Sequence, residues 1–228
     1  MKIEIEGEQC EINVVNFLAC PLLVSPTTFR LTENEMNVVI NSRFKKVEAS
    51  GDDKAILGSG VMTSQNTRLL KEPGLERLRS FMVTFTENFV RDCLQITDEF
   101  YLTNSWATKN VKNSAHHIHN HDTTLLSAIY YAEAESGDLV LSSNRSGMFP
   151  NFDFTWNLSK FNNFNSKTWN IPVRTGNIVI FPGWLNHYST PNLHDKPRIL
   201  IGANFFARGI FGSSDTLDLI NIGDTNGT

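Results

Sequence analysis

The chain has 228 residues, of which 40% are hydrophobic and 19% charged, a composition that indicates a folded protein and argues against a disordered one. Its net charge of −4 argues against a nucleic-acid or anionic-membrane partner, because such binders usually present a basic face. No apolar run approaches the roughly 20 residues that would span a bilayer, so we expect no membrane partner.

The first 98 residues are predicted to form a hairpin and two supporting helices. The segments KIEIE and CEINVVNF alternate around Gly7, which indicates a hairpin within the first 24 residues. A helix follows, because Thr32 and Glu35 have the spacing of a capping box. Its predicted apolar face consists of Met36, Val39, Ile40 and Phe44.

A second, longer helix is predicted to begin near Pro73, since proline is favoured in the first turn of a helix. Apolar residues then recur at intervals of three or four, which is the period of a helix. They are Leu75, Leu78, Met82, Phe85, Phe89 and Cys93. We interpret this stripe as core packing and not as a functional site.

From about residue 99 the pattern becomes strand-like, and the chain is predicted to be mainly β with N-terminal helices. Short apolar segments separated by turn residues indicate a sandwich or barrel. They are 100–108, 125–133, 138–143, 171–173, 177–182, 186–190 and 198–206. We expect residues 1–98 and 99–228 to form one folding unit, because the apolar faces of the helices need a sheet to cover.

The segment SAHHIHNHDTTLLSAIYY (114–131) holds His116, His117, His119 and His121, four of the six histidines in the chain. Residues i and i+2 of a strand share a face. Either His117 with His119, or His119 with His121, could therefore offer two imidazoles to one divalent metal. The alternative is a polar loop that is merely rich in histidine.

A metal site needs a third ligand, and only His187 and His194 remain. His187 lies among apolar strands in VIFPGWLNHYST, whereas His194 lies in the polar segment NLHDKPR, so His187 is the better candidate. Arg198 opens the next predicted strand, eleven residues after His187. A buried arginine is costly unless it meets a carboxylate, so a metal near Arg198 suggests a small dicarboxylic co-substrate.

From Asn104 to Leu219 the chain resembles the iron(II)- and 2-oxoglutarate-dependent oxygenases, most of all the group found in tailed phages that infect cyanobacteria. The matching segments are TNSWATK, HNHDTTLLSAIYY, SGDLVLSS, GNIVIFPGWLNHYSTPN and RILIGANFFARGIFGSSDTL. Relatives place the first metal ligand eight residues before the serine that corresponds to Ser127. The resemblance therefore selects His119 and His121 as the pair.

The resemblance implies a double-stranded β-helix, a cupin-like jelly roll, with a metal at one mouth held by His119, His121 and His187. It implies Fe(II), 2-oxoglutarate and O2 as cofactors, with Arg198 binding the distal carboxylate of 2-oxoglutarate. Most relatives carry a carboxylate where this chain has His121. Asp122 is the alternative ligand, but its side chain would point to the opposite face of a strand.

The implied function is a dioxygenase that hydroxylates a C–H bond of a peptide or small molecule and releases succinate and CO2. No catalytic residue is expected beyond the metal centre. Two alternatives stay open: a non-catalytic jelly-roll binding or structural module with a metal site, and a cupin-type three-histidine dioxygenase that needs no 2-oxoglutarate. Arg198 discriminates between these readings, since neither alternative needs a carboxylate-binding fork.

Weaker expectations concern residues around the expected centre. Tyr131 or its neighbour Tyr130 could donate a hydrogen bond to 2-oxoglutarate, with core packing as the alternative. Asn204 shares a strand face with Arg198 and could orient a ligand, with a strand-end hydrogen bond as the alternative. Trp106 could line the cavity, but packing is the preferred interpretation.

The insert 147–170 holds seven aromatic residues and is interpreted as a substrate-binding lid, because aromatic-rich loops bind ligands by stacking. A hairpin that closes the barrel and a homodimer contact are the alternatives. His116 and His117 are interpreted as loop residues near the rim of the site.

The N-terminus, MKIEIEGEQ, alternates charged and apolar residues and does not resemble a signal peptide. The three cysteines, Cys10, Cys20 and Cys93, have no paired spacing, which favours free thiols in a reducing compartment. We therefore expect a cytoplasmic protein, in the cytoplasm of the infected host if the gene is phage-encoded.

Overall fold

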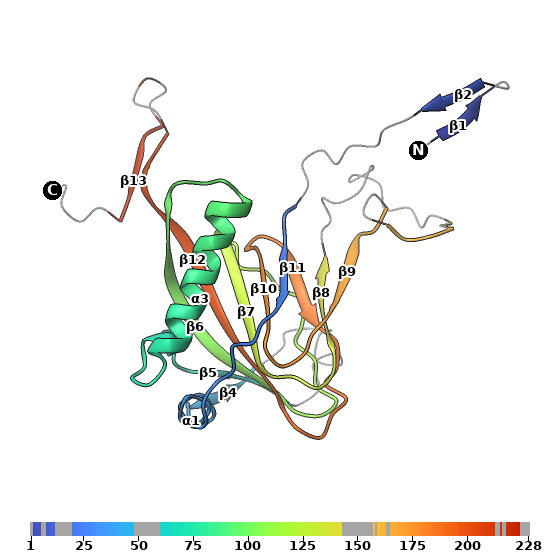
Figure 1. The fold of residues 1–228 in the computed structure, drawn as a ribbon. Coiled ribbons are helices and arrows are strands. Elements are labelled where there is room, and N and C mark those ends of the chain that lie inside the picture. Colours follow the sequence, from blue (N-terminus) through green and yellow to red (C-terminus); the bar gives the residue numbers. More distant parts are fainter. Residues whose placement is uncertain are drawn as a thin grey trace.

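The computed structural model describes residues 2–5, 8–11, 20–47, 60–142, 157, 159–162, 165–212, 215 and 218–223. Two β-sheets pack against each other, and the helix α3 (Glu76–Asn88) lies across the outer face of the larger sheet (Figure 1). Among the described residues, no helix has the length and apolar character needed to cross a membrane.

The larger sheet is antiparallel and is built around the long strand β12, which pairs with both β6 and β7. In spatial order its strands are β3 (Leu23–Pro26), β10 (Asn177–Pro182), β7 (Leu126–Glu133), β12 (Arg198–Phe211), β6 (Glu99–Asn110), β5 (Val61–Ser64) and β4 (Phe44–Lys46), with β13 (Ile220–Ile222) paired to the end of β12. The smaller sheet has the order β11 (Asn186–Ser189), β8 (Asp138–Ser142), β9 (Thr168–Pro172).

The chain passes between the two sheets in the manner of a double-stranded β-helix. It runs from β7 in the larger sheet to β8 and β9 in the smaller one, returns to β10, crosses again to β11 and comes back to β12. The predicted fold class, a mainly β jelly roll with N-terminal helices, is therefore confirmed.

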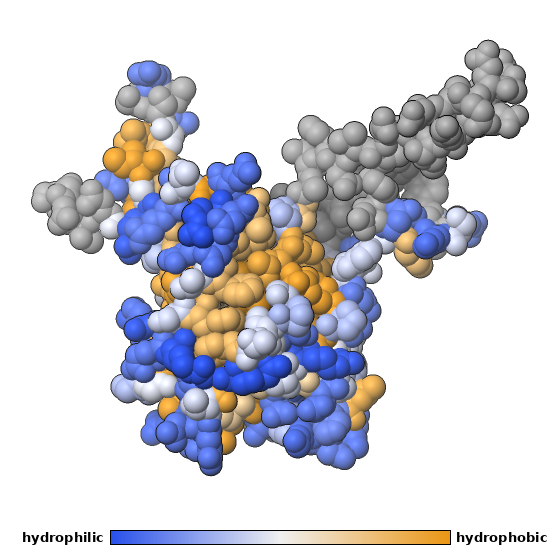
Figure 2. All heavy atoms as spheres, viewed as in Figure 1, coloured by the Kyte–Doolittle hydropathy of each residue, from blue (hydrophilic) through white to orange (hydrophobic). Residues whose placement is uncertain are grey.

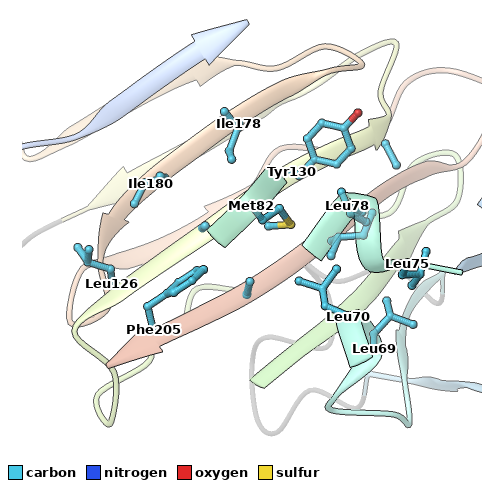
Figure 3. Close-up of a cluster of buried hydrophobic side chains, with 14 of the residues drawn as sticks. Leu69, Leu70, Leu75, Leu78, Met82, Leu126, Tyr130, Ile178, Ile180 and Phe205 are labelled. Atoms are coloured by element: carbon cyan, nitrogen blue, oxygen red, sulfur yellow. The ribbon is translucent and has the colours of Figure 1, made fainter. Parts of the chain in front are cut away.

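Strand β7 is buried along almost its whole length, because both of its faces are covered. Tyr130 packs with Leu78 and Met82 in the cluster between the larger sheet and α3 (Figure 3). Tyr131, the next residue, belongs to the second cluster, between the two sheets. This follows from the two-residue period of a strand, which sends neighbours to opposite faces. The histidine-lined cavity described below lies on the Tyr131 side.

Part of the outer face of the larger sheet is apolar and visible beside α3 (Figure 2). Figure 2 shows hydrophobic residues gathered over the sheet beside α3, with hydrophilic residues around them. Helix α3 covers part of this face with its own apolar side. The helix therefore has the supporting role expected from its sequence.

Helix α1 (Glu33–Ile40) begins at the predicted capping box. The Glu35 N–H donates to Thr32 Oγ1 at 3.2 Å, and the Thr32 N–H donates to Glu35 Oε2 at 2.7 Å. The predicted apolar face is partly wrong, because the helix ends at residue 40. Ile40 is 43% exposed, and Phe44 lies in β4.

Helix α3 begins three residues after Pro73 and continues into a one-turn π-helix, η3 (Phe89–Cys93). A short 3₁₀-helix, η2 (Leu69–Lys71), precedes it. Leu78 and Met82 are fully buried, as predicted. Cys93 is exposed, so the last member of the predicted stripe is wrong. The wider π turn breaks the 3.6-residue period there.

An ion pair ties the two helices together. Arg77 Nε donates to Glu35 Oε1 at 3.0 Å, and the Glu35 side chain is 5% exposed whereas that of Arg77 is 49% exposed. Burial raises the pKa of Glu35, but the hydrogen bonds from Arg77 and Thr32 outweigh it and hold the pKa below its usual value. The carboxylate is therefore better stabilised in the folded chain than in the unfolded one.

All seven strands predicted after residue 99 are present, as β6 to β12. The short strands β3, β4, β5 and β13 were not predicted, because three or four residues are too few to show alternation. The predicted hairpin is present as β1 (Lys2–Ile5) paired with β2 (Glu8–Glu11). Its turn at Gly7, residues 12–19 and most of the aromatic insert lie outside the described residues. The division of the chain at residue 98 stays a prediction.

Candidate metal centre

His116, His117, His119 and His121 lie in a loop, so the strand geometry used to pair them does not apply. The loop is nevertheless held against β11, because the His119 N–H donates to His187 O at 3.0 Å and the His187 N–H donates to His119 O at 2.8 Å. The His121 N–H donates to Gly183 O at 2.8 Å, just after β10. These contacts fix the loop beside β11, so His119 and His121 converge with His187.

His119, His121 and His187 each offer one ring nitrogen, and these nitrogens lie within 4.8 Å of one another. The ring centroids of His119 and His187 are 4.2 Å apart. The Nδ1 atoms of these two rings lie 2.9 Å from His117 O and 3.1 Å from Leu185 O, respectively. A carbonyl only accepts, so Nδ1 carries the proton and Nε2 is left free, the arrangement that metal-binding histidines usually have.

Burial keeps these imidazoles in the neutral form that binds metals. It lowers the pKa of His121 to about 4, with a further contribution from His119, and it holds the pKa of His187 well below its ordinary value. Asp122 and His194 are exposed and lie outside the cluster. The structure thus brings together the three histidines chosen from the sequence and leaves the two alternative ligands apart.

The three histidines line a cavity between the two sheets, with a volume of about 490 Å³ that includes space open to solvent. Its walls are largely apolar and come from β6, β7, β8 and β12. They include Trp106, Ile129, Leu139 and Leu200. A mostly apolar cavity with a few convergent polar groups is the usual form of a small-molecule site.

Arg198 is 1% exposed and incompletely partnered. Its Nη2 donates to Thr190 O at 2.9 Å and its Nη1 to Ser136 O at 3.4 Å, whereas Nε has no hydrogen-bond partner among the described residues. No carboxylate in the described part of the chain lies within 4.0 Å of it. Burial lowers the pKa of Arg198, and Tyr131 and Asp138 oppose this shift. Arginine stays charged in proteins, so this charge is buried without an ion-pair partner among the residues that the structure describes.

The two tyrosines of β7 point to opposite faces of the larger sheet. Tyr131 lines the cavity, and burial raises the pKa of its hydroxyl, which stays protonated and able to donate. Tyr130 donates to Phe29 O at 2.9 Å on the opposite face. Asn204 is 6% exposed and its Oδ1 accepts from Ser127 Oγ at 2.8 Å. Ser127 lines the cavity, whereas Asn204 is not among the lining residues.

Trp106 and His116 line the cavity, although neither was selected from the sequence as a site residue. Trp106 was interpreted as packing, but it lines the cavity with its ring 5.3 Å from that of His121. A Cβ at Gly202 would lie 2.6 Å from the Trp106 indole, so the glycine makes room for that ring. An isolated glycine inside a strand often marks such an approach, and this signal was available. His116, expected near the rim, also lines the cavity.

The residues of the site fit both a divalent metal and the carboxylate of a co-substrate. Three neutral imidazoles suit a first-row divalent metal such as Fe(II). Nε of the buried Arg198, which has no partner within the described ranges, suits a carboxylate, since guanidinium–carboxylate pairs are strong and directional. The distal carboxylate of 2-oxoglutarate would supply that partner.

Residues 104–204 match the family model described as "Putative 2OG-Fe(II) oxygenase". The matched segment runs from β6 into β12 and contains all three histidines and Arg198. No protein of curated function shows significant sequence similarity to the chain.

Solved structures with a similar fold include three proteins of low sequence identity. The α-ketoglutarate-dependent epimerase SnoN from nogalamycin biosynthesis is 11% identical over 92% of this chain and 87% of that one, with a TM-score of 0.56. HygX from Streptomyces hygroscopicus is 15% identical over 82% of each chain, with a TM-score of 0.53. A prolyl hydroxylase from Trichoplax adhaerens is 13% identical over 81% of this chain and 83% of that one, with a TM-score of 0.53.

These observations converge. The double-stranded β-helix, the histidine cluster inside it and the similar solved structures all agree with the family match. The segment that holds the candidate site, residues 104–204, is therefore similar to the 2-oxoglutarate- and iron(II)-dependent oxygenases.

Proposed function

We propose that His119, His121 and His187 hold the iron of this oxygenase, and that Arg198 binds the distal carboxylate of 2-oxoglutarate. The observation that carries the proposal is the buried, incompletely partnered guanidinium of Arg198, whose strand β12 also forms a wall of the histidine-lined cavity. A buried charge without an anion is strongly unfavourable. Its retention supports a ligand that supplies the missing charge.

The surroundings of Arg198 support an orienting role. The carbonyl oxygens of Thr190 and Ser136 accept from its two Nη atoms, which fixes the plane of the fork without neutralising it. A carboxylate can accept two parallel hydrogen bonds from such a fork. We assign a third hydrogen bond to the Tyr131 hydroxyl. Asn204 would act more indirectly, by holding the Ser127 hydroxyl in the cavity wall.

Bound iron and 2-oxoglutarate would supply the oxidising chemistry, with succinate and CO2 as products beside the hydroxylated substrate. The chain itself would hold the co-substrate in place and shield the reacting groups from water. The Arg198 fork fixes the co-substrate in one pose, which removes orientational freedom before reaction. The apolar walls at Ile129, Leu139 and Leu200 limit the water around the reacting groups.

We further propose that the substrate is a small molecule or a peptide. HygX is described with hygromycin B bound and the Trichoplax enzyme with a peptide fragment, so this fold accommodates both classes. The aromatic insert 147–170 is our candidate for the segment that contacts substrate, and its described members Phe161 and Trp169 are 72% and 48% exposed. We also infer, from the segments quoted above, that the chain groups with oxygenases of cyanobacterial phages and works in the cytoplasm of the host.

The test is calorimetric titration of 2-oxoglutarate into Mn(II)-loaded protein. Arg198→Ala is expected to weaken binding by about 10- to 100-fold, since a hydrogen bond to a charged group contributes about 1.5–3 kcal/mol. Arg174→Ala is the matched control, because Arg174 is exposed whereas Arg198 is buried. Unchanged binding in folded Arg198→Ala would contradict the assignment and favour a three-histidine enzyme without 2-oxoglutarate.

A further inference from the structure

A second group of histidines lies beside the first. His116, His117 and His119 each offer a ring nitrogen, and these three nitrogens lie within 4.8 Å of one another. The ring centroids of His116 and His119 are 4.4 Å apart, those of His116 and His117 are 4.7 Å apart, and those of His117 and His119 are 5.1 Å apart. The spacing is similar to that within the proposed iron-binding set, where His119 and His121 are 5.2 Å apart.

One backbone carbonyl orients two of these rings. The Nδ1 atoms of His116 and His119 lie 3.3 Å and 2.9 Å from the same acceptor, His117 O. Because a carbonyl accepts only, both rings carry their proton on Nδ1 and present an unprotonated Nε2. Such a carbonyl contact is the usual support of a metal-ligating histidine. The loop thus prepares His116 in the same way as His119.

The third ring carries an unsatisfied atom. Nδ1 of His117 is buried and has no hydrogen-bond partner among the described residues. Such an atom is unfavourable unless it finds a partner, and a metal ion bound through it would be one. The second group therefore combines two oriented imidazoles with a third whose Nδ1 lacks a partner in the described part of the chain.

We propose that His116, His117 and His119 form an alternative site for a divalent ion that prefers imidazole ligands. This inference rests on the proposed function, because His119 would belong to both sites. With Nδ1 of His119 donating to His117 O, only Nε2 can bind a metal, so the two sites exclude each other. Zn²⁺ suits an imidazole set. Zn²⁺ in the second site would withdraw His119 from the iron and hold the enzyme inactive.

The test is Zn²⁺ binding to a metal-free protein that lacks the proposed iron site. We expect His121→Ala/His187→Ala to bind one Zn²⁺ per chain by calorimetry and by elemental analysis. Adding His116→Ala and His117→Ala should weaken that binding by about 100-fold or more, since even a lost supporting contact costs about 10- to 100-fold. Adding His194→Ala, which changes an exposed histidine, should change nothing.

Because His187 is buried, the double variant is checked for folding by circular dichroism. The single His121→Ala variant, altered only in the loop, serves if the double variant is unfolded. Absence of Zn²⁺ binding in a folded variant, or binding that survives loss of His116 and His117, would overturn the proposal. Wild-type protein should bind one Zn²⁺ in total, and a second ion of similar affinity would refute the mutual exclusion. Failure of the iron-site assignment would show separately, in the Mn(II) and 2-oxoglutarate titration.

Discussion

Gly137→Ala is expected to weaken the use of 2-oxoglutarate, although it replaces no residue proposed to bind iron or 2-oxoglutarate. Gly137 has φ +97°, and a Cβ there would overlap Nη1 of Arg198. The guanidinium would have to leave its place between the carbonyls of Thr190 and Ser136. Loss of one hydrogen bond to a charged group costs about 1.5–3 kcal/mol, and therefore raises the KM for 2-oxoglutarate about 10- to 100-fold. The assay follows succinate formation against 2-oxoglutarate concentration.

Gly176→Ala is a closely matched control. Gly176 has φ +85°, and a Cβ there would overlap Nη1 of Arg30, an exposed arginine outside the cavity. Both variants should lose about 1–3 kcal/mol of folding stability, because an alanine is strained at such φ values. Only Gly137→Ala should raise the KM. An unchanged KM in folded Gly137→Ala, or an equal rise in Gly176→Ala, would refute the reasoning.

Three further predictions concern the third metal ligand, the Glu35 ion pair and the N-terminal part of the chain. His187→Ala should abolish Fe(II) binding measured by calorimetry, whereas exposed His194→Ala should leave it unchanged, and equal losses would show that the third ligand is wrongly chosen. The pKa of Glu35 is lower in the folded chain than in the unfolded one. Ionised Glu35 therefore stabilises the fold by about 1 kcal/mol above its unfolded-state pKa, and this stabilisation is lost as the pH falls through its folded-state pKa. Glu35→Gln should flatten the pH dependence of the unfolding free energy between about pH 5 and 3, and an unchanged slope would contradict this. A chain cut to residues 99–228 should not fold by circular dichroism, because α3 covers the outer face of the larger sheet, and a cooperative melt would refute the single folding unit.

The strands could be predicted because their signals are local. Each of the segments from 100–108 to 198–206 carries its own apolar pattern and its own turn residues, and each forms a strand. The capping box at Thr32 is likewise a local signal, and α1 begins there. The edge strands β4 and β5 depend on partners distant in sequence. Nothing within their few residues distinguishes them from a loop.

The three histidines were predicted correctly, but the strand geometry used to pair two of them is wrong. His119 and His121 were expected on a strand, but they lie in a loop whose backbone is fixed by His187 and Gly183. That pairing joins segments more than 60 residues apart, so no local pattern reveals it. The second group, with His116 and His117, depends on how the loop folds back toward His119 and could not be inferred from spacing alone.

Tyr131 illustrates a further limit. Alternation along β7 shows that Tyr130 and Tyr131 face opposite ways, but it does not show which face holds the cavity. Only the packing of α3 on the Tyr130 side decides this. For Arg198, the sequence indicated that a buried charge needs a carboxylate, and the structure shows the charge buried with its Nε unpartnered.

The central claim is that three imidazoles and the Arg198 guanidinium together hold iron and 2-oxoglutarate. The most direct measurement is the visible absorbance of anaerobic Fe(II)-loaded protein as 2-oxoglutarate is added. A weak charge-transfer band should grow to saturation in the wild type and should require much higher 2-oxoglutarate in Arg198→Ala. Iron that binds tightly yet develops no band in the wild type would contradict the account.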